Sequence, residues 1–216
     1  MIMIKKISPL PEFLIERYNN WRSTLYSNNL KKFNKLAIQG QNPYSMVISC
    51  CDSRVHVTSI FGADEGEIFI HRNIANLVPP YSLNENYDST AAAIEYATKE
   101  LKIRHLIILG HTGCGGIKTS YLIHKKKLNR NYTFINKWLS IIQPAHNSIS
   151  KSFSEEDQIE QLAEESIKNS LNILFSFPDI KLLVENNHLS IHGLIHDIGS
   201  GRLKYLDPIT RTFQNV

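Results

Sequence analysis

Residues 50–54 place two thiols, a carboxylate and a guanidinium within five consecutive positions. The apolar run that precedes them is typical of a buried strand that ends at a site. Side chains alternate between the two faces of a strand, so we expect Cys50 and Asp52 on one side and Cys51 on the other, packed behind the strand. Arg54 is close enough in sequence to pair with Asp52. This grouping of residue types favours a chemical role for the segment over a structural one.

A second apolar run, residues 105–110, leads into His111-Thr112-Gly113-Cys114-Gly115-Gly116. The carboxyl ends of parallel strands meet near the point where the strand order reverses, so both segments are expected to reach one crevice. Two thiolates (Cys50 and Cys114) and one imidazole (His111) suit zinc. Three protein ligands leave a fourth position open, as in catalytic zinc sites. The residues therefore predict a zinc enzyme.

Asp52 has two possible roles beside such a metal. It could accept a hydrogen bond from zinc-bound hydroxide and orient that group for attack, or it could bind zinc directly and close the site. Arg54 favours the first role, because a paired carboxylate stays ionised and away from the metal. We therefore predict that Asp52 and Arg54 are catalytic residues.

Other chemistries account for fewer of these residues. A structural zinc site needs a fourth cysteine or histidine, and the nearby candidate, Cys51, is expected to face away. A phosphate-binding loop is disfavoured because Lys118 is not preceded by the required glycine. A nucleophilic Cys50 with His111 as its base would leave Cys114 without a role.

The composition is that of an ordinary globular chain: 216 residues, 42% hydrophobic and 20% charged, with a formal charge of +4. The basic run at residues 124–127 lacks interleaved aromatic residues, so we expect no nucleic-acid partner. No apolar stretch approaches a membrane span, and the apolar start is too short for a signal peptide. Three cysteines do not form a disulfide framework. We expect a soluble, cytoplasmic protein.

The elements that must position these residues predict a single α/β domain over residues 1–216. Its centre is a mostly parallel β-sheet flanked by helices, with an N-terminal helical arm over residues 1–40 and a C-terminal antiparallel edge strand. Strands are predicted at 44–49, 67–71, 105–110, 189–196 and 202–206, and helices at 88–101, 134–145, 155–175 and 178–185. The helix at 88–101 lies between two strands and therefore predicts a right-handed parallel crossover.

The C-terminal strands are predicted to form a hairpin through the tight turn at Gly199-Ser200-Gly201. His188, His192 and His196 are spaced four apart, which on a helix would favour metal binding. They lie in a strand-like run instead, so we interpret them as core or surface histidines.

The sequence closely resembles the β-class carbonic anhydrases, in particular a plant-like subgroup. The matching segments are Cys50-Cys51-Asp52-Ser53-Arg54, residues 69–78 (FIHRNIANLV), His111-Thr112-Gly113-Cys114-Gly115-Gly116 and Ile191-His192-Gly193. They occur in the family's order and cover nearly the whole chain. The combination is far more specific than any one of these motifs.

The resemblance implies a zinc ion on Cys50, His111 and Cys114, with the Asp52–Arg54 pair controlling access to it. It also implies a substrate pocket at a subunit interface, formed by Gln41, Phe69, Ile74 and Tyr96, and hence at least a homodimer. A small apolar slot with one amide donor suits carbon dioxide. Gln41 would stabilise the charge that develops as bicarbonate forms.

The expected activity is the reversible hydration of carbon dioxide to bicarbonate and a proton by zinc-bound hydroxide. Two alternatives remain open at this point. The same scaffold could hydrolyse carbon disulfide or carbonyl sulfide, or the protein could be a zinc-binding module without turnover. The Asp52–Arg54 pair argues against the inert module, and Gln41 favours carbon dioxide.

Overall fold

The computed structural model describes residues 8–82 and 89–216. The chain divides into two compact units, Met1–Gln41 and Asn42–Val216. Asp88, the first residue of the helix predicted at 88–101, lies outside the described residues.

The first unit is a helical arm, as the pattern of residues 12–38 predicted. It comprises α1 (Glu12–Trp21), a π-helical turn (Arg22–Tyr26) and α2 (Leu30–Gln39). Trp21, Tyr26 and Phe33 form an aromatic cluster, in which the rings of Tyr26 and Phe33 stack at 4.9 Å. Most of its large apolar side chains nevertheless remain exposed: Leu10, Phe13, Leu14, Ile15, Tyr18, Trp21, Leu25, Leu30 and Ile38.

The second unit is built on a six-stranded sheet with the order β2-β1-β3-β4-β5-β6. The first four strands in this order are parallel, and β5 and β6 are antiparallel to their neighbours. The strands are β1 (Ser45–Cys50), β2 (Ile68–Asn73), β3 (His105–His111), β4 (Ser190–His196), β5 (Leu203–Leu206) and β6 (Phe213–Asn215). The predicted parallel sheet and C-terminal hairpin are confirmed, and β6 adds a second antiparallel strand that we did not predict.

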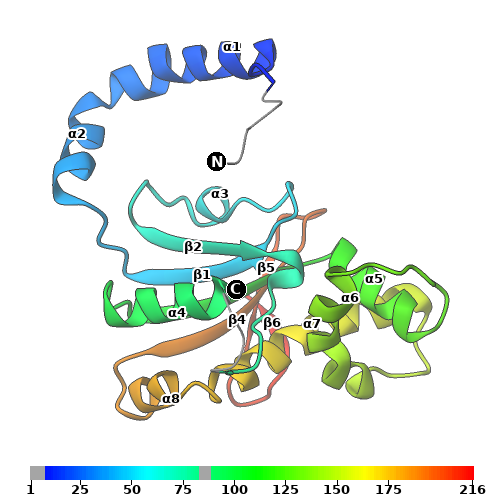
Figure 1. Ribbon diagram of the computed structural model, residues 1–216. Helices are drawn as coiled ribbons and strands as arrows, with labels where there is room; N and C mark the ends of the chain where they lie inside the picture. Colours follow the sequence, from blue (N-terminus) through cyan, green and yellow to red (C-terminus); the bar gives the residue numbers. More distant parts are fainter. Residues whose placement is uncertain (1–7, 83–88) are drawn as a thin grey trace, which may run out of the picture. The chain divides into compact units, whose positions relative to one another are not determined.

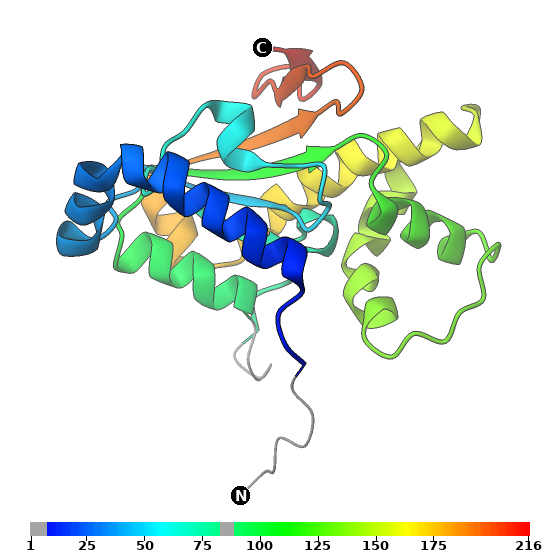
Figure 2. The same ribbon diagram turned by 90° about the horizontal axis from the view of Figure 1, so that it is seen from above.

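Helices cover both faces of this sheet (Figure 1). The helix α3 lies on one face, and α4, α7 and α8 lie on the other; Figure 2 shows the same layers from above. The helical elements of this unit are α3 (Val57–Phe61), a 3₁₀ turn (Ile74–Asn76), α4 (Ser89–Lys99), α5 (Gly115–His124), α6 (Ile135–Leu139), a 3₁₀ segment (Ser140–Ser148), α7 (Glu155–Leu174) and α8 (Pro178–Glu185). Among the described residues, no helix is both long enough and apolar enough to cross a membrane.

Two apolar clusters follow from the alternation along β1. Met46, Ile48 and Cys50 face a large core shared with α4 and α7, whereas Val47 faces a smaller one shared with α3. Both sets are nearly inaccessible to solvent. The apolar run therefore has a physical cause: a central parallel strand is buried on both faces.

Two glycines allow α7 to lie close to the sheet. A Cβ added at Gly110 on β3 would lie 2.7 Å from Ile167 Cδ1, and one at Gly193 on β4 would lie 2.9 Å from Ile167 Cγ2. Ile167 is fully buried on α7. The close approach of this helix therefore depends on two residues without side chains.

Candidate metal centre and active site

Three side chains converge where the strand order reverses. Cys50 ends β1, His111 ends the neighbouring parallel strand β3, and Cys114 immediately precedes α5. Their exposed fractions are 5%, 1% and 2%. Their ligand atoms all lie within 4.8 Å of one another, and the two sulfur atoms are 3.9 Å apart. The sequence placed all three residues in one crevice, and the structure brings them together there.

The two thiols influence each other's ionisation. A hydrogen bond from Cys114 lowers the pKa of Cys50, and the same interaction with Cys50, together with burial, raises the pKa of Cys114. One thiolate of the pair therefore opposes formation of the second. A divalent cation between them would neutralise both, so the thiol pair suits a metal better than it suits two free thiolates.

The imidazole of His111 is oriented by its own loop. Nδ1 lies 3.0 Å from the Thr112 carbonyl oxygen, which can only accept, so Nδ1 carries the proton. Nε2 then presents a lone pair towards the thiols. It is buried, and no described residue forms a hydrogen bond with it. A buried nitrogen with a free lone pair beside two thiols is the arrangement that a zinc-binding histidine needs.

Asp52 lies beside this cradle and is held by Arg54. Its Oδ1 accepts from Arg54 Nε (2.9 Å) and from the Arg54 backbone N–H (3.0 Å), and its Oδ2 accepts from Arg54 Nη2 (2.7 Å). These bonds hold the pKa of Asp52 well below its usual range. Asp52 Oδ2 is 3.9 Å from His111 Nε2. The predicted pair is therefore formed, with an ionised carboxylate next to the metal-binding atoms.

Two further side chains fix the backbone around these residues. Arg72 donates from Nε to the Cys50 carbonyl (2.9 Å) and from Nη2 to the Asp52 carbonyl (2.7 Å). Glu160 Oε1 accepts from the Gly113 N–H (2.9 Å). The sequence indicated Arg72 only as part of the segment 69–78 that matches the family. Glu160 was missed, because Glu160 lies 46 positions after Cys114 and nothing in that spacing points to the loop.

Three of the four predicted substrate-binding residues, Phe69, Ile74 and Tyr96, lie in the second unit. The rings of Phe69 and Tyr96 lie 5.9 Å apart, and Tyr96 is 48% exposed. Ile74 is 38% exposed and lines a separate groove. Gln41 is an exposed residue at the end of the first unit. Phe69 and Tyr96 are therefore in ring contact.

Ile74 and Cys51 border a groove of about 980 Å³ in the second unit. Cys51 is exposed there, so the expectation that it packs behind the strand is wrong. The reason is that β1 ends at Cys50, and strand alternation no longer applies beyond that residue. The groove is lined by Cys51, Asn73, Ile74, Pro79, Pro80, Ser89, Thr90, Phe134, Ile135, Lys137, Trp138, Ser140, Ile141, Pro144, Asn169 and Ile173.

Comparison with known proteins gives a consistent result. Residues 45–203 match the family model described as carbonic anhydrase. The chain is 36% identical to β carbonic anhydrase 3 of Arabidopsis thaliana over 185 residues, which cover 84% of this chain and 71% of that protein. It is 30% identical to a carbonic anhydrase of Helicobacter pylori over 187 residues, which cover 81% of this chain and 84% of that protein.

Solved structures give the same result. The β-carbonic anhydrase CcaA superposes with a TM-score of 0.87 at 28% identity, covering 95% of this chain and 98% of that one. A β-carbonic anhydrase described as tetrameric, from Sordaria macrospora, gives 0.76 at 31% identity, covering 90% and 95%. With a family match that spans most of the chain and the three-residue cradle in place, the chain belongs to the β class of the carbonic anhydrase family.

Proposed function

We propose that this protein catalyses the zinc-dependent, reversible hydration of carbon dioxide to bicarbonate and a proton. The observation that carries the proposal is the cradle of Cys50, His111 and Cys114 beside an ionised Asp52, in a chain of this family. The named relatives are carbonic anhydrases, which favours carbon dioxide over its sulfur analogues and turnover over an inert zinc module.

The residues present suit zinc. Two mutually opposed thiols and one imidazole with a buried, unpaired Nε2 make a soft, three-ligand set. Bound zinc would supply a Lewis acid that lowers the pKa of a water molecule towards neutrality. Cys50, His111 and Cys114 would hold the ion, and the buried position of all three limits the access of solvent.

Asp52 and Arg54 would orient the reacting water. Asp52 Oδ2 can accept a hydrogen bond from that water and direct its lone pair towards the carbon atom. Arg54 contacts both carboxylate oxygens and also donates to the Gly113 carbonyl (3.2 Å), so the carboxylate is held in one orientation. Arg54 therefore sets the geometry of Asp52.

The substrate pocket is proposed to involve Gln41, Phe69, Ile74 and Tyr96. Phe69, Ile74 and Tyr96 offer the apolar surface that a small nonpolar molecule requires, and Gln41 offers an amide donor. The exposure of Ile74 and Tyr96 in the single chain supports a pocket completed by another subunit. We accordingly propose a homodimer or larger homo-oligomer.

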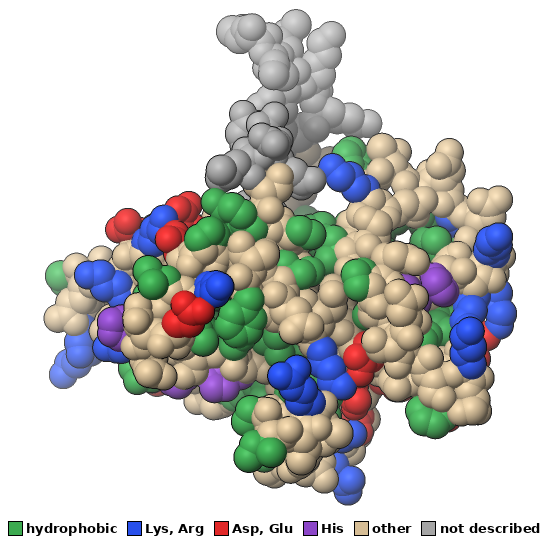
Figure 3. Space-filling view, turned by 90° about the horizontal axis from the view of Figure 1, so that it is seen from below, with side chains coloured by type: hydrophobic (Ala, Val, Ile, Leu, Met, Phe, Trp, Pro, Cys, Tyr) green, Lys and Arg blue, Asp and Glu red, His purple; other side chains and the backbone are tan. Residues whose placement is uncertain are grey.

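Oligomerisation has further support. The first unit exposes many large apolar side chains, and Figure 3 shows hydrophobic side chains gathered in several places on one face of the molecule. The Sordaria macrospora relative is described as tetrameric. Three free cysteines support a reducing compartment, so we propose that the protein is cytoplasmic and serves carbon utilisation.

Zinc content and stopped-flow hydration of carbon dioxide test the activity, with wild type compared with Cys50→Ser. Wild type is expected to carry one zinc per chain and to be active, and Cys50→Ser to lose most of both. Wild-type protein that binds zinc but shows no hydration between pH 7 and 9 would reject the assignment.

Asp52→Ala tests the orienting role. This variant should keep its zinc, because Asp52 does not supply one of the three ligands. Its turnover should fall roughly a hundredfold or more, the range in which positioned acid–base groups contribute. Unchanged turnover would show that Asp52 does not orient the reacting water.

A further inference from the structure

The loop between His111 and Cys114 sets the distance between two of the three metal ligands. Gly113, in its middle, has a positive φ of 64°, a conformation that favours glycine. Neighbouring groups hold the loop from both ends. The Thr112 N–H donates to the His196 carbonyl (3.0 Å), and the Cys114 carbonyl accepts from Lys118 N–H within α5 (3.0 Å).

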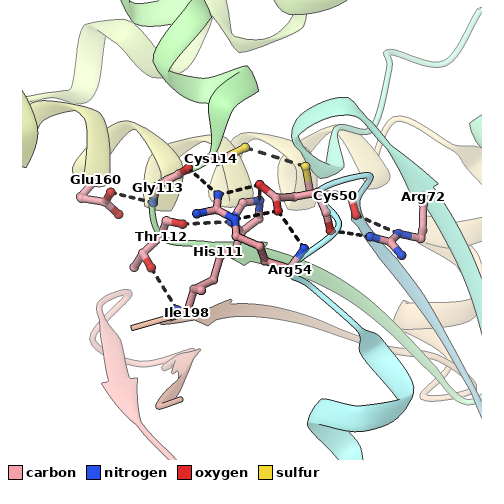
Figure 4. Close-up of polar contacts among 10 residues, drawn as sticks. Cys50, Arg54, Arg72, His111, Thr112, Gly113, Cys114, Glu160 and Ile198 are labelled. Atoms are coloured by element: carbon pink, nitrogen blue, oxygen red, sulfur yellow. Dashed lines mark hydrogen bonds and ion pairs between the residues drawn. The ribbon is translucent and has the colours of Figure 1, made fainter. Parts of the chain in front are cut away.

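The two peptide groups that flank the Gly113 Cα are each held by one side chain (Figure 4). Arg54 Nη2 donates to the Gly113 carbonyl at 3.2 Å, and Glu160 Oε1 accepts from the Gly113 N–H at 2.9 Å. Arg54 belongs to the catalytic pair already described. Glu160 is a separate group that comes from α7.

The helix that carries Glu160 is itself firmly placed. Ile167 lies seven positions after Glu160, on the same side of α7, and occupies the space left by Gly110 and Gly193. Gly110 directly precedes His111. The helix is therefore packed against the end of β3, where the loop begins. The hydrogen bond from the Gly113 N–H to the Glu160 carboxylate anchors the loop to this helix.

Glu160 is also an unusual residue to find here. Its Oε2 is buried, and none of the residues that the structure describes donates a hydrogen bond to it. A buried carboxylate oxygen without a protein donor is unfavourable, so a contribution to stability alone does not account for the side chain. Its other oxygen, Oε1, contacts the backbone between two metal ligands.

We propose that Glu160 is a positioning residue of the metal centre. It fixes the peptide between Thr112 and Gly113 and thereby holds His111 and Cys114 at the separation that a zinc ion requires. The inference rests on the proposed function only insofar as the cradle binds zinc. It assigns Glu160 no contact with the metal or the substrate.

Three variants at this position separate geometry from charge. Glu160→Gln keeps an acceptor oxygen at the same reach and removes the charge, Glu160→Met keeps the length without an acceptor, and Glu160→Asp keeps the charge at a shorter reach. Glu156→Gln is the control, because Glu156 is exposed one turn earlier on α7. Zinc dissociation constants come from chelator competition, and cobalt substitution reports ligand geometry through its visible spectrum.

Glu160→Met and Glu160→Asp are expected to weaken zinc affinity by about 10- to 100-fold and to change the cobalt spectrum, as losses of groups that orient metal ligands do. Glu160→Gln and Glu156→Gln are expected to stay within about threefold of wild type, because the first retains the acceptor and the second never touches the loop. A Glu160→Met protein with wild-type affinity and spectrum would overturn the proposal. So would a Glu160→Gln protein as impaired as Glu160→Met.

Amide hydrogen exchange of the unmodified, metal-free protein provides a decision even where Glu160→Met does not fold. The Gly113 N–H should exchange at least roughly tenfold more slowly than an exposed loop amide, since it donates a hydrogen bond to the half-buried Glu160 carboxylate. Exchange at the exposed rate would overturn the proposal. None of these measurements needs carbon dioxide turnover, so a zinc-loaded but inactive protein would refute the proposed function and leave this inference standing.

Discussion

At the scale of single residues, the site is defined by what holds each charged group in place. Asp52 receives three hydrogen bonds from Arg54, and they lower its pKa from an ordinary value of 3.8. Asp52 would be ionised near neutral pH with the ordinary pKa as well as with the lowered one. The contribution of Arg54 to the reaction is therefore geometric, because ionisation of Asp52 at neutral pH does not depend on it.

Replacing Arg54 with lysine tests that distinction. Lysine keeps the positive charge but cannot contact both carboxylate oxygens with a planar fork. We expect kcat/KM of the zinc-saturated protein to fall roughly tenfold or more. The pKa of Asp52 rises towards 3.8 but stays below the assay range, so the pH profile between 6.5 and 9 keeps its shape. Stopped-flow hydration across that range measures both, and a new loss of activity below pH 7 would contradict the geometric role.

Arg72 has a comparable task on the other half of the site. Its guanidinium contacts the carbonyls of Cys50 and Asp52, one from Nε and one from Nη2. An Arg72→Lys variant can reach only one of them, and we expect zinc affinity to fall about tenfold. Chelator competition measures the change. Arg104→Lys, at an exposed position, is the control, and equal affinities in the two variants would refute the role.

At the scale of elements, the site depends on how closely α7 approaches β3 and β4. Gly193→Ala places a methyl group 2.9 Å from Ile167 Cγ2 and 3.0 Å from Leu171 Cδ1, both in buried side chains. We expect the free energy of unfolding to fall by about 1–3 kcal/mol, which is typical of overpacking. Gly199→Ala is the control, since its new Cβ meets only Asp197 Oδ1 at 3.5 Å. Urea denaturation monitored by circular dichroism compares them, and equal midpoints would contradict the packing argument.

Elements were predicted well from the sequence where their cause is local. The apolar runs of β1 and β3 and the acidic first turn of α7 each reflect burial or capping within a few residues. Cys50, His111 and Cys114 were predicted to lie together because two thiols and an imidazole at the ends of two parallel strands are typical of a zinc site, and their ligand atoms do lie within 4.8 Å of one another. Glu160, Cys51 and β6 were not predicted correctly, because each depends on tertiary packing or on the residue at which a strand ends.

At the scale of the whole molecule, a buried histidine links folding to pH. His146 is 6% exposed, and its Nε2 lies 3.0 Å from Ser120 Oγ. Burial, and to a lesser extent the charges of His124 and Lys125, lower the pKa of His146 from 6.5 to about 4. As pH falls below 6.5, His146 becomes protonated in the unfolded chain but stays neutral in the folded chain. The free energy of unfolding is therefore unaffected by titration of His146 above pH 6.5 and decreases between pH 6.5 and about 4.

His146→Gln should remove this dependence. Relative to pH 7.5, wild type is expected to lose about 2 kcal/mol more stability than the variant at pH 5, since each pH unit below 6.5 contributes about 1.4 kcal/mol. Urea denaturation of both metal-free proteins at the two pH values measures the difference. An identical pH dependence of the two proteins would show that folding does not lower the pKa of His146.

The mass in solution tests the proposed assembly. One chain has a mass of 24.7 kDa, so light scattering should give at least twice that value for wild type. Replacing Phe13 and Leu14, both exposed on α1, with serine should lower the mass or raise the concentration at which the assembly dissociates. A wild-type mass of a single chain would refute the proposed oligomer.

The position of the cradle at the reversal of strand order also bears on how the protein acquires its native structure. Cys50 and Cys114 are separated by 64 positions, and their sulfur atoms meet only once β1 and β3 have paired. Closing a loop of that length costs conformational entropy, and this cost is met before the contact between the two residues can stabilise the chain. Metal capture in a refolding experiment would therefore report completion of the sheet's parallel centre, and a bound ion would act as a long-range cross-link that slows unfolding of the sheet.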